Sequence, residues 1–176
     1  YEDVITTIGT ELQDVIESAY DKHGREDTII ITRSNKRANQ FNQHIRQEIL
    51  GHEEELNVGD FLMVVRNNYF WLEDDQNKYT DFIANGDVVE VTSVKGYADH
   101  YGYRFADVEI QMIDYPEIPP FEVRMILETL YDETPNLGPE KSKALYHYVA
   151  EDYMELKNKS KIHKAIMDDP NFNALQ

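Results

Sequence analysis

The sequence contains no cysteine among its 176 residues. Without thiol side chains, the chain can form no disulfide, no thiolate nucleophile and no cysteine-ligated zinc site. It also lacks an apolar run of the length that a membrane span needs, and it lacks a signal segment with a charged start and an apolar middle. These absences fit a cytoplasmic protein, and we expect no membrane partner.

Several signatures of catalysis are also missing. The phosphate-binding loop GxxxxGK[ST], GxGxxG after a strand, HExxH and GxSxG do not occur. The six histidines are scattered without the spacing of metal ligands. We therefore assign no catalytic residue and no metal site to this chain, and we expect no cofactor bound to it alone.

Basic residues are scarce. The chain has 34 Asp and Glu but only 17 Lys and Arg, which gives a formal net charge of −17. Affinity for nucleic-acid phosphates comes mostly from Lys and Arg, so this charge argues against a phosphate-binding surface. A local basic patch can still exist in an acidic protein. The hydrophobic fraction of 41% predicts a globular chain, and the length of 176 residues suits one domain or two small ones.

The segment Thr28–Leu50, TIIITRSNKRANQFNQHIRQEIL, carries the strongest structural signal. Its β-branched start, Thr28–Thr32, is typical of a strand buried on both faces of a parallel sheet. Ser34 or Asn35 can then cap a helix by accepting a hydrogen bond from a first-turn amide. The apolar stripe of that helix consists of Ala38, Phe41, Ile45 and Ile49, and Gly51 ends it.

A helix is also predicted before this strand, with apolar residues at helical spacing from Leu12 to Tyr20 and a stop at Gly24. Residues 1–52 therefore read as helix, strand, helix. One parallel strand cannot form a sheet, so we expect its neighbours to lie outside this chain. The absence of an initiator Met and the apolar phrase that ends at Gln176 support the same expectation.

Residues 53–130 show another pattern, in which short strand-like segments alternate with turns. The hairpin signal Asn85-Gly86 is the clearest turn, interpreted here as type I′. This pattern predicts a small antiparallel barrel. Strands are expected at 61–66, 69–72, 87–94, 104–113 and 121–127, a turn at 57–60, a polar loop at 73–80, and a Gly- and Tyr-rich loop after 94.

Residues 131–176 are predicted to be mainly helical. One helix starts near Pro139, with a stripe that runs from Leu145 to Leu156, and a shorter basic helix spans 157–167. The predicted fold class is therefore α+β, with an α/β fragment, an antiparallel barrel and C-terminal helices.

Two groups of residues could bind a ligand. The first lies at the start of the helix after Thr32, where free amides and the helix dipole favour an anion. An ordinary solvated helix cap explains it at least as well. Its candidate residues are Arg33, Ser34, Asn35 and Arg37, with Lys36 and Arg46 nearby.

The second group surrounds the aromatic run at 69–71, which could stack nucleic-acid bases in a barrel cleft. Side chains alternate along a strand, so core packing is the better interpretation for two of its three aromatic residues. The candidate residues are Arg66, Asn67, Asn68, Tyr69 and Trp71.

These segments resemble a known family. TRSNKRANQFNQHIR is similar to motif IV of superfamily 1 DNA helicases. GDFLMVVRNNYFWL and FIANGDVVEV resemble the barrel inserted in the second motor domain of RecD-like helicases, which include the exodeoxyribonuclease V alpha subunit. DPNFNALQ resembles the segment that leads into the next motor strand of this family. The resemblance covers the chain from about Thr28 to Gln176.

The resemblance implies a motor of two RecA-like domains with ATP and Mg²⁺ between them. Single-stranded DNA would cross both domains and be gripped by the SH3-like barrel. This chain would supply part of the second motor domain (1–52), the barrel (53–130) and a helical return segment (131–176). Its partners would be single-stranded DNA and the remaining helicase domains. Alone it lacks the phosphate loop and should not hydrolyse ATP.

One position departs from the related UvrD-like pattern, in which an Arg that reaches the γ-phosphate follows the motif Asn by four positions. Asn39 occupies that position here, although Arg37 lies nearby. We therefore assign no γ-phosphate arginine. Arg33, Ser34 and Asn35 match the shared part, which implies a role near the nucleotide cleft or the DNA backbone. The alternative function is an acidic protein-interaction module without motor activity, which the net charge favours.

Overall fold

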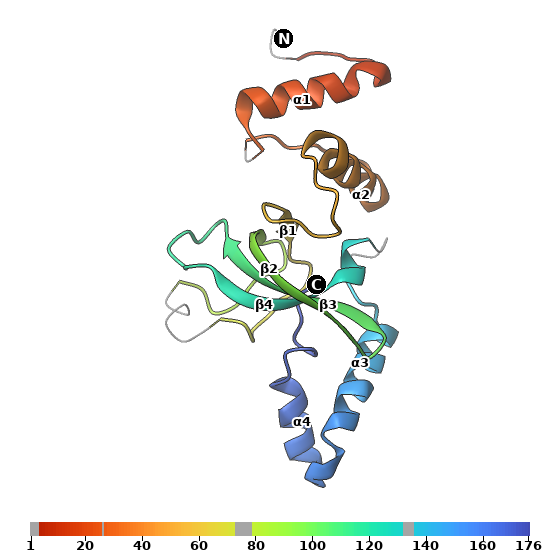
Figure 1. Ribbon diagram of the computed structural model, residues 1–176, viewed down its shortest axis with the longest axis vertical. Coiled ribbons are helices and arrows are strands. Elements are labelled where there is room, and N and C mark those ends of the chain that lie inside the picture. Colours follow the sequence, from red (N-terminus) through yellow and green to blue (C-terminus); the bar gives the residue numbers. More distant parts are fainter. Residues whose placement is uncertain (1–3, 26, 73–78, 132–135) are drawn as a thin grey trace. The chain divides into compact units, whose positions relative to one another are not determined.

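A computed structural model describes residues 4–25, 27–72, 79–131 and 136–176. The chain divides into two compact units, Tyr1–Glu53 and Glu54–Gln176. It combines helices with a curled, four-stranded antiparallel sheet (Figure 1), so the predicted α+β class is confirmed. Most of the polar loop predicted at 73–80 lies outside the described residues.

The first unit is helical. It contains η1 (Gly9–Glu11), α1 (Leu12–His23) and α2 (Asn35–His44), which continues as the π-helical turn η2 (Ile45–Ile49). Gly24 ends α1 as predicted, with φ of 81° and its N–H donating to the Tyr20 carbonyl. Ser34 caps α2, since its Oγ accepts a hydrogen bond from the Arg37 N–H at 3.3 Å.

The strand predicted at Thr28–Thr32 is not formed, and this prediction is wrong for the structure. A strand needs a hydrogen-bonded neighbour, and none of the described residues pairs with this segment. None of its side chains is buried: Ile29 and Ile31 are 84% and 87% exposed, and Thr28, Ile30 and Thr32 are half-buried. The apolar run therefore lacks the two sheet faces that its sequence is suited to.

The sheet of the second unit has the order β1-β2-β3-β4, all neighbours antiparallel. Its strands are β1 (Phe61–Met63), β2 (Val88–His100), β3 (Tyr103–Met112) and β4 (Phe121–Ile126). Two register shifts in β2, between Val91 and Ser93 and between Val94 and Gly96, interrupt its pairing with β3. Such bulges bend a strand and increase its twist, which accounts for the curl.

Three local predictions for this sheet need correction. β2 continues through the expected Gly- and Tyr-rich loop to His100, because Tyr side chains suit a strand and Gly96 sits at a bulge. Residues 69–72 form no strand, and Asn68 contributes only an isolated bridge. At Asn85-Gly86 only Gly86 has positive φ, 104°, which fits a type II turn and not type I′.

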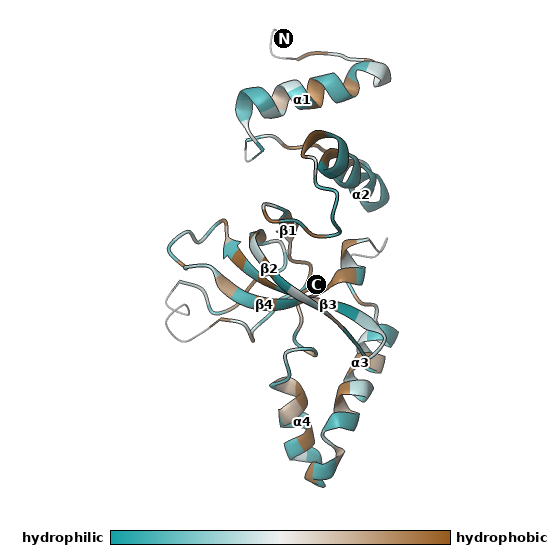
Figure 2. Ribbon diagram, viewed as in Figure 1, coloured by the Kyte–Doolittle hydropathy of each residue, from teal (hydrophilic) through white to brown (hydrophobic). Residues whose placement is uncertain are grey.

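Hydrophobic residues inside the curled sheet form its core, which consists of Leu56, Val64, Ile83, Val89, Val91, Ala106, Val108, Ile110, Met112, Ile118, Val123, Met125, Leu127 and Leu175. Figure 2 shows the corresponding alternation of hydrophobic and hydrophilic positions along the strands. Strand side chains alternate between faces, so one face fills the core while the other meets solvent.

The predicted C-terminal helices are confirmed as α3 (Pro139–Asp152) and α4 (Lys159–Met167), with the short turns η3 (Leu127–Leu130) and η4 (Met154–Leu156) before each. A second core holds them against the ends of β3 and β4, and consists of Phe105, Ile126, Leu137, Leu145, Val149, Ile166 and Ala174.

The Tyr101 hydroxyl, at the β2–β3 turn, donates to the Asp152 carboxylate on α3. Burial and this hydrogen bond raise the pKa of Tyr101.

The last residues return to the sheet and join its two edges. Leu175 lies parallel to β4, where its N–H donates to the Arg124 carbonyl at 2.8 Å and its carbonyl accepts from the Ile126 N–H at 3.0 Å. The Gln176 carbonyl accepts from the N–H of Val65, two residues beyond β1, at 2.8 Å. Residues 174–176 are therefore part of the barrel-like structure and not only a helical return.

Candidate functional site

An open groove of about 780 Å³ lies between two segments that are far apart in the sequence. The first wall is formed by residues 66–70 together with Asn85 of the turn before β2. The second wall follows the end of α4 and consists of Met167, Asp168, Phe172, Asn173, Ala174 and Gln176. Four of the predicted DNA-contacting residues, Arg66, Asn67, Asn68 and Tyr69, are thus brought together.

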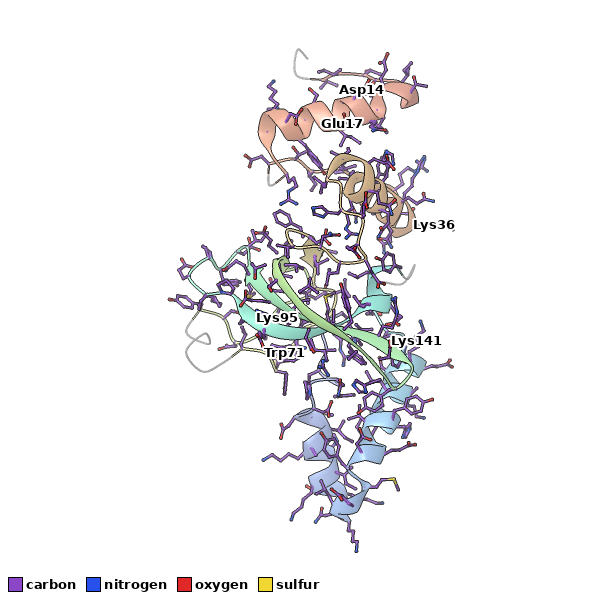
Figure 3. The ribbon with its side chains drawn as sticks, in the orientation of Figure 1. Asp14, Glu17, Lys36, Trp71, Lys95 and Lys141 are labelled. Carbon is purple, nitrogen blue, oxygen red and sulfur yellow. The ribbon has the colours of Figure 1, made fainter. Side chains whose placement is uncertain are left out.

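Two predicted residues hold the walls together. The Asn68 Nδ2 and the Trp71 Nε1 both donate to the Asn173 carbonyl, at 2.7 and 2.8 Å. Asn68 Oδ1 also accepts the Phe70 N–H at 2.9 Å. Trp71 (Figure 3) packs against the sheet core and does not line the groove. The polar groups of Asn68 and Trp71 therefore hold the two walls in place. Contacts with a ligand must come from the exposed residues beside them.

The second wall is fixed by a buried carboxylate. Asp169 Oδ1 accepts the N–H groups of Asn171 and Phe172 at 2.7 and 3.2 Å, and Oδ2 accepts the Tyr153 hydroxyl at 2.7 Å. This bond to Asp169, together with desolvation, raises the pKa of Tyr153 to about 12. The Asn173 Nδ2 donates to the Met167 and Asp169 carbonyls. The turn at 169–173 therefore presents a preorganised surface.

The first wall presents one aromatic ring and one cation. Tyr69 is 69% exposed and stacks on Phe82 with ring centroids 4.8 Å apart. Arg66 is exposed, and no hydrogen bond or ion pair to another described residue engages its side chain. Asn67 Oδ1 accepts the Asn85 N–H at 2.8 Å, which leaves its amide near the groove edge. An aromatic face beside an unpaired arginine can stack a base and neutralise its phosphate.

Sequence reasoning missed the partner of this ring and the whole second wall. Phe82 precedes the hairpin signal Asn85-Gly86, and nothing local indicates that it supports Tyr69. Asn68 and Asn173 are 105 residues apart. Only the return of the chain after α4 brings the two walls together, and no spacing pattern encodes that return.

The other predicted group lies in the first unit, at the start of α2. Arg33, Ser34, Asn35 and Arg37 are all exposed. Ser34 is committed to the helix cap, whereas the guanidinium groups of Arg33 and Arg37 form no ion pair with other described residues. The sequence contains no Asp or Glu from Thr28 to Gln47, which makes this stretch basic in a strongly acidic chain. The arrangement is suited to an anion.

Within the described part of the chain, no helix has the length and apolarity to cross a membrane, and no cluster of three or more His, Asp or Glu could hold a metal ion. None of the family models compared with this sequence matches it, and no curated protein does either.

Proposed function

We propose that this chain is part of a RecD-like, ATP-dependent DNA helicase that acts in the cytoplasm in DNA repair and recombination. Its second unit is then the SH3-like barrel that grips single-stranded DNA, and its first unit belongs to the second motor domain. The observation that carries the proposal is the groove in which exposed Tyr69, supported by Phe82, lies beside Arg66, whose side chain has no partner among the described residues. Stacking and phosphate contact are the two interactions that single-stranded DNA requires.

The exposed apolar segment of the first unit supports the same proposal. Exposed Ile29 and Ile31 belong to a segment whose composition suits a central parallel strand, and α2 follows it directly. In open α/β sheets, ligands bind beyond the carboxyl ends of the strands, and Arg33 would lie there once residues 28–32 joined such a sheet. The remaining helicase domains would supply the neighbouring strands.

ATP and Mg²⁺ would be held mainly by those other domains. At the start of α2, the guanidinium groups of Arg33 and Arg37, which pair with none of the described residues, and the first-turn amides fit a phosphate. The stretch from Thr28 to Gln47 contains no Asp or Glu, so it offers no carboxylate to Mg²⁺. When bound, ATP would supply the energy for movement along DNA. Arg33 and Arg37 would contact only the edge of the ATP site or the DNA backbone.

Replacing Arg33 tests that assignment in the full-length helicase. The Arg33→Ala variant should lower DNA-stimulated ATP hydrolysis about tenfold or more, since a hydrogen bond to a charged group contributes about 1.5–3 kcal/mol. The measurement is the steady-state ATPase rate with saturating oligonucleotide. Lys22→Ala, at an exposed position on α1, is the control. An unchanged rate in Arg33→Ala would remove Arg33 from the site.

The net charge of −17 favours a second function, an acidic module that binds a protein partner. A salt titration of this chain with fluorescent oligo-dT separates the two functions. Phosphate contacts make log K fall with log salt by about 0.7 for each contact with a single strand. We expect log K to fall linearly with log salt, with a slope that corresponds to at least one phosphate contact. No binding even at low salt would reject the DNA-gripping function and favour the protein-interaction module.

A further inference from the structure

The most basic stretch of the second unit runs from the end of η4 into α4 and has no role in the groove described above. Four lysines occur between residues 157 and 164, in the sequence KNKSKIHK, although the whole chain is acidic. All four are exposed, and none forms an ion pair with another described residue. They are Lys157, Lys159, Lys161 and Lys164.

Two of these lysines lie on the solvent side of α4. Ile166 is fully buried against α3 and the sheet ends, and Ile162 is partly buried in the same cluster. At 100° per residue, Lys161 and Lys164 project from the face opposite Ile166. Their ammonium groups are therefore available to a ligand.

This lysine face adjoins the groove. Met167 and Asp168, at the end of α4, form part of the second wall. Residues three or four apart on a helix are surface neighbours, so Lys164 adjoins both of them and Lys161 adjoins Lys164. Asp168 places one negative charge at the junction, but no ion pair joins it to Lys164. The positive face thus continues outward from the groove along the helix.

We propose that Lys161 and Lys164 bind the phosphates of a nucleic-acid strand as it leaves the groove, so that α4 extends the binding path. The inference rests on the proposed function, because it requires a strand in the groove. Lys161 lies six positions before Met167 on α4, which is about 9 Å at 1.5 Å per residue. That length accommodates roughly three stacked nucleotides at about 3.4 Å each.

The length of the oligonucleotide provides the test. Binding of labelled oligo-dT from about 4 to about 16 nucleotides, the range of single-domain sites, is measured by fluorescence anisotropy. Wild-type affinity should rise beyond the length that fills the groove. The Lys161→Gln/Lys164→Gln variant should bind the shortest oligonucleotides normally and lose that rise. Its salt slope on long oligonucleotides should fall by about 1.4, because two phosphate contacts are removed.

A matched control changes the same charge elsewhere. The Lys22→Gln/Lys95→Gln variant removes one lysine on α1 and one on the sheet, where Lys95 (Figure 3) lies near Glu109 and Glu122. It should keep the wild-type length dependence. Circular dichroism of both variants checks that each one folds.

Two outcomes would overturn the inference while leaving the groove intact. One is wild-type behaviour of Lys161→Gln/Lys164→Gln at every length, and the other is an equal loss at all lengths. If the wild-type chain bound no oligo-dT of any length, the proposed function and this inference would both be rejected. If Tyr69→Ala weakened binding while the lysine variant did not, only the path along α4 would be rejected.

Discussion

The Tyr69→Ala variant should bind oligo-dT about 5- to 150-fold more weakly than the wild-type chain. Base stacking on an aromatic side chain contributes about 1–3 kcal/mol per base, and every 1.4 kcal/mol is a factor of ten in affinity. Tyr69 is 69% exposed in the groove, and Phe82 holds its ring by stacking. The exposed side chain can be removed without opening a core. Fluorescence anisotropy at low salt measures the loss.

Two further variants separate stacking from other effects. Tyr69→Phe should bind with nearly wild-type affinity, because the ring carries the interaction. The hydrogen bond that its hydroxyl accepts from Asn67 Nδ2 is long, at 3.5 Å, and therefore weak. Tyr97→Ala removes a tyrosine that is 57% exposed on β2 and does not line the groove, so it should change nothing. Equal binding by Tyr69→Ala and Tyr97→Ala would mean that the groove does not stack bases.

The elements that could be predicted from the sequence are those whose signal is local. β3, β4 and α3 follow from alternation, helical periodicity and Pro139, and the structure places them within a few residues of the prediction. Gly24 and Ser34 mark helix ends because their conformations satisfy backbone groups nearby. Each of these features depends on neighbours in the chain.

The features that could not be predicted depend on distant partners. The run at Thr28–Thr32 has the composition of a buried strand, yet its conformation depends on neighbours that none of the described residues supplies. The candidate site shows the same division. Arg66, Asn67 and Tyr69 are identifiable because they are close in sequence. Asn173 reaches the same groove only across the fold, where its carbonyl accepts from Asn68 and Trp71.

Leu175 anchors the C-terminal segment where it returns to the sheet. Its side chain is 6% exposed in the sheet core, and its backbone pairs with β4. Leu175→Ala should lower the free energy of unfolding by about 2–5 kcal/mol, the usual effect of such a truncation in a core. Chemical denaturation monitored by the fluorescence of Trp71, the single tryptophan, measures the change.

A comparison with Leu156→Ala decides whether the C-terminal segment closes the sheet. Leu156 is 40% exposed at the end of η4, so its truncation should change stability by no more than about 0.5 kcal/mol. Equal stability of the two variants would mean that residues 174–176 do not pack against β4 in solution. A large loss confined to Leu175→Ala would support the closure. The groove would then depend on the same contact, because Ala174 and Gln176 line its second wall.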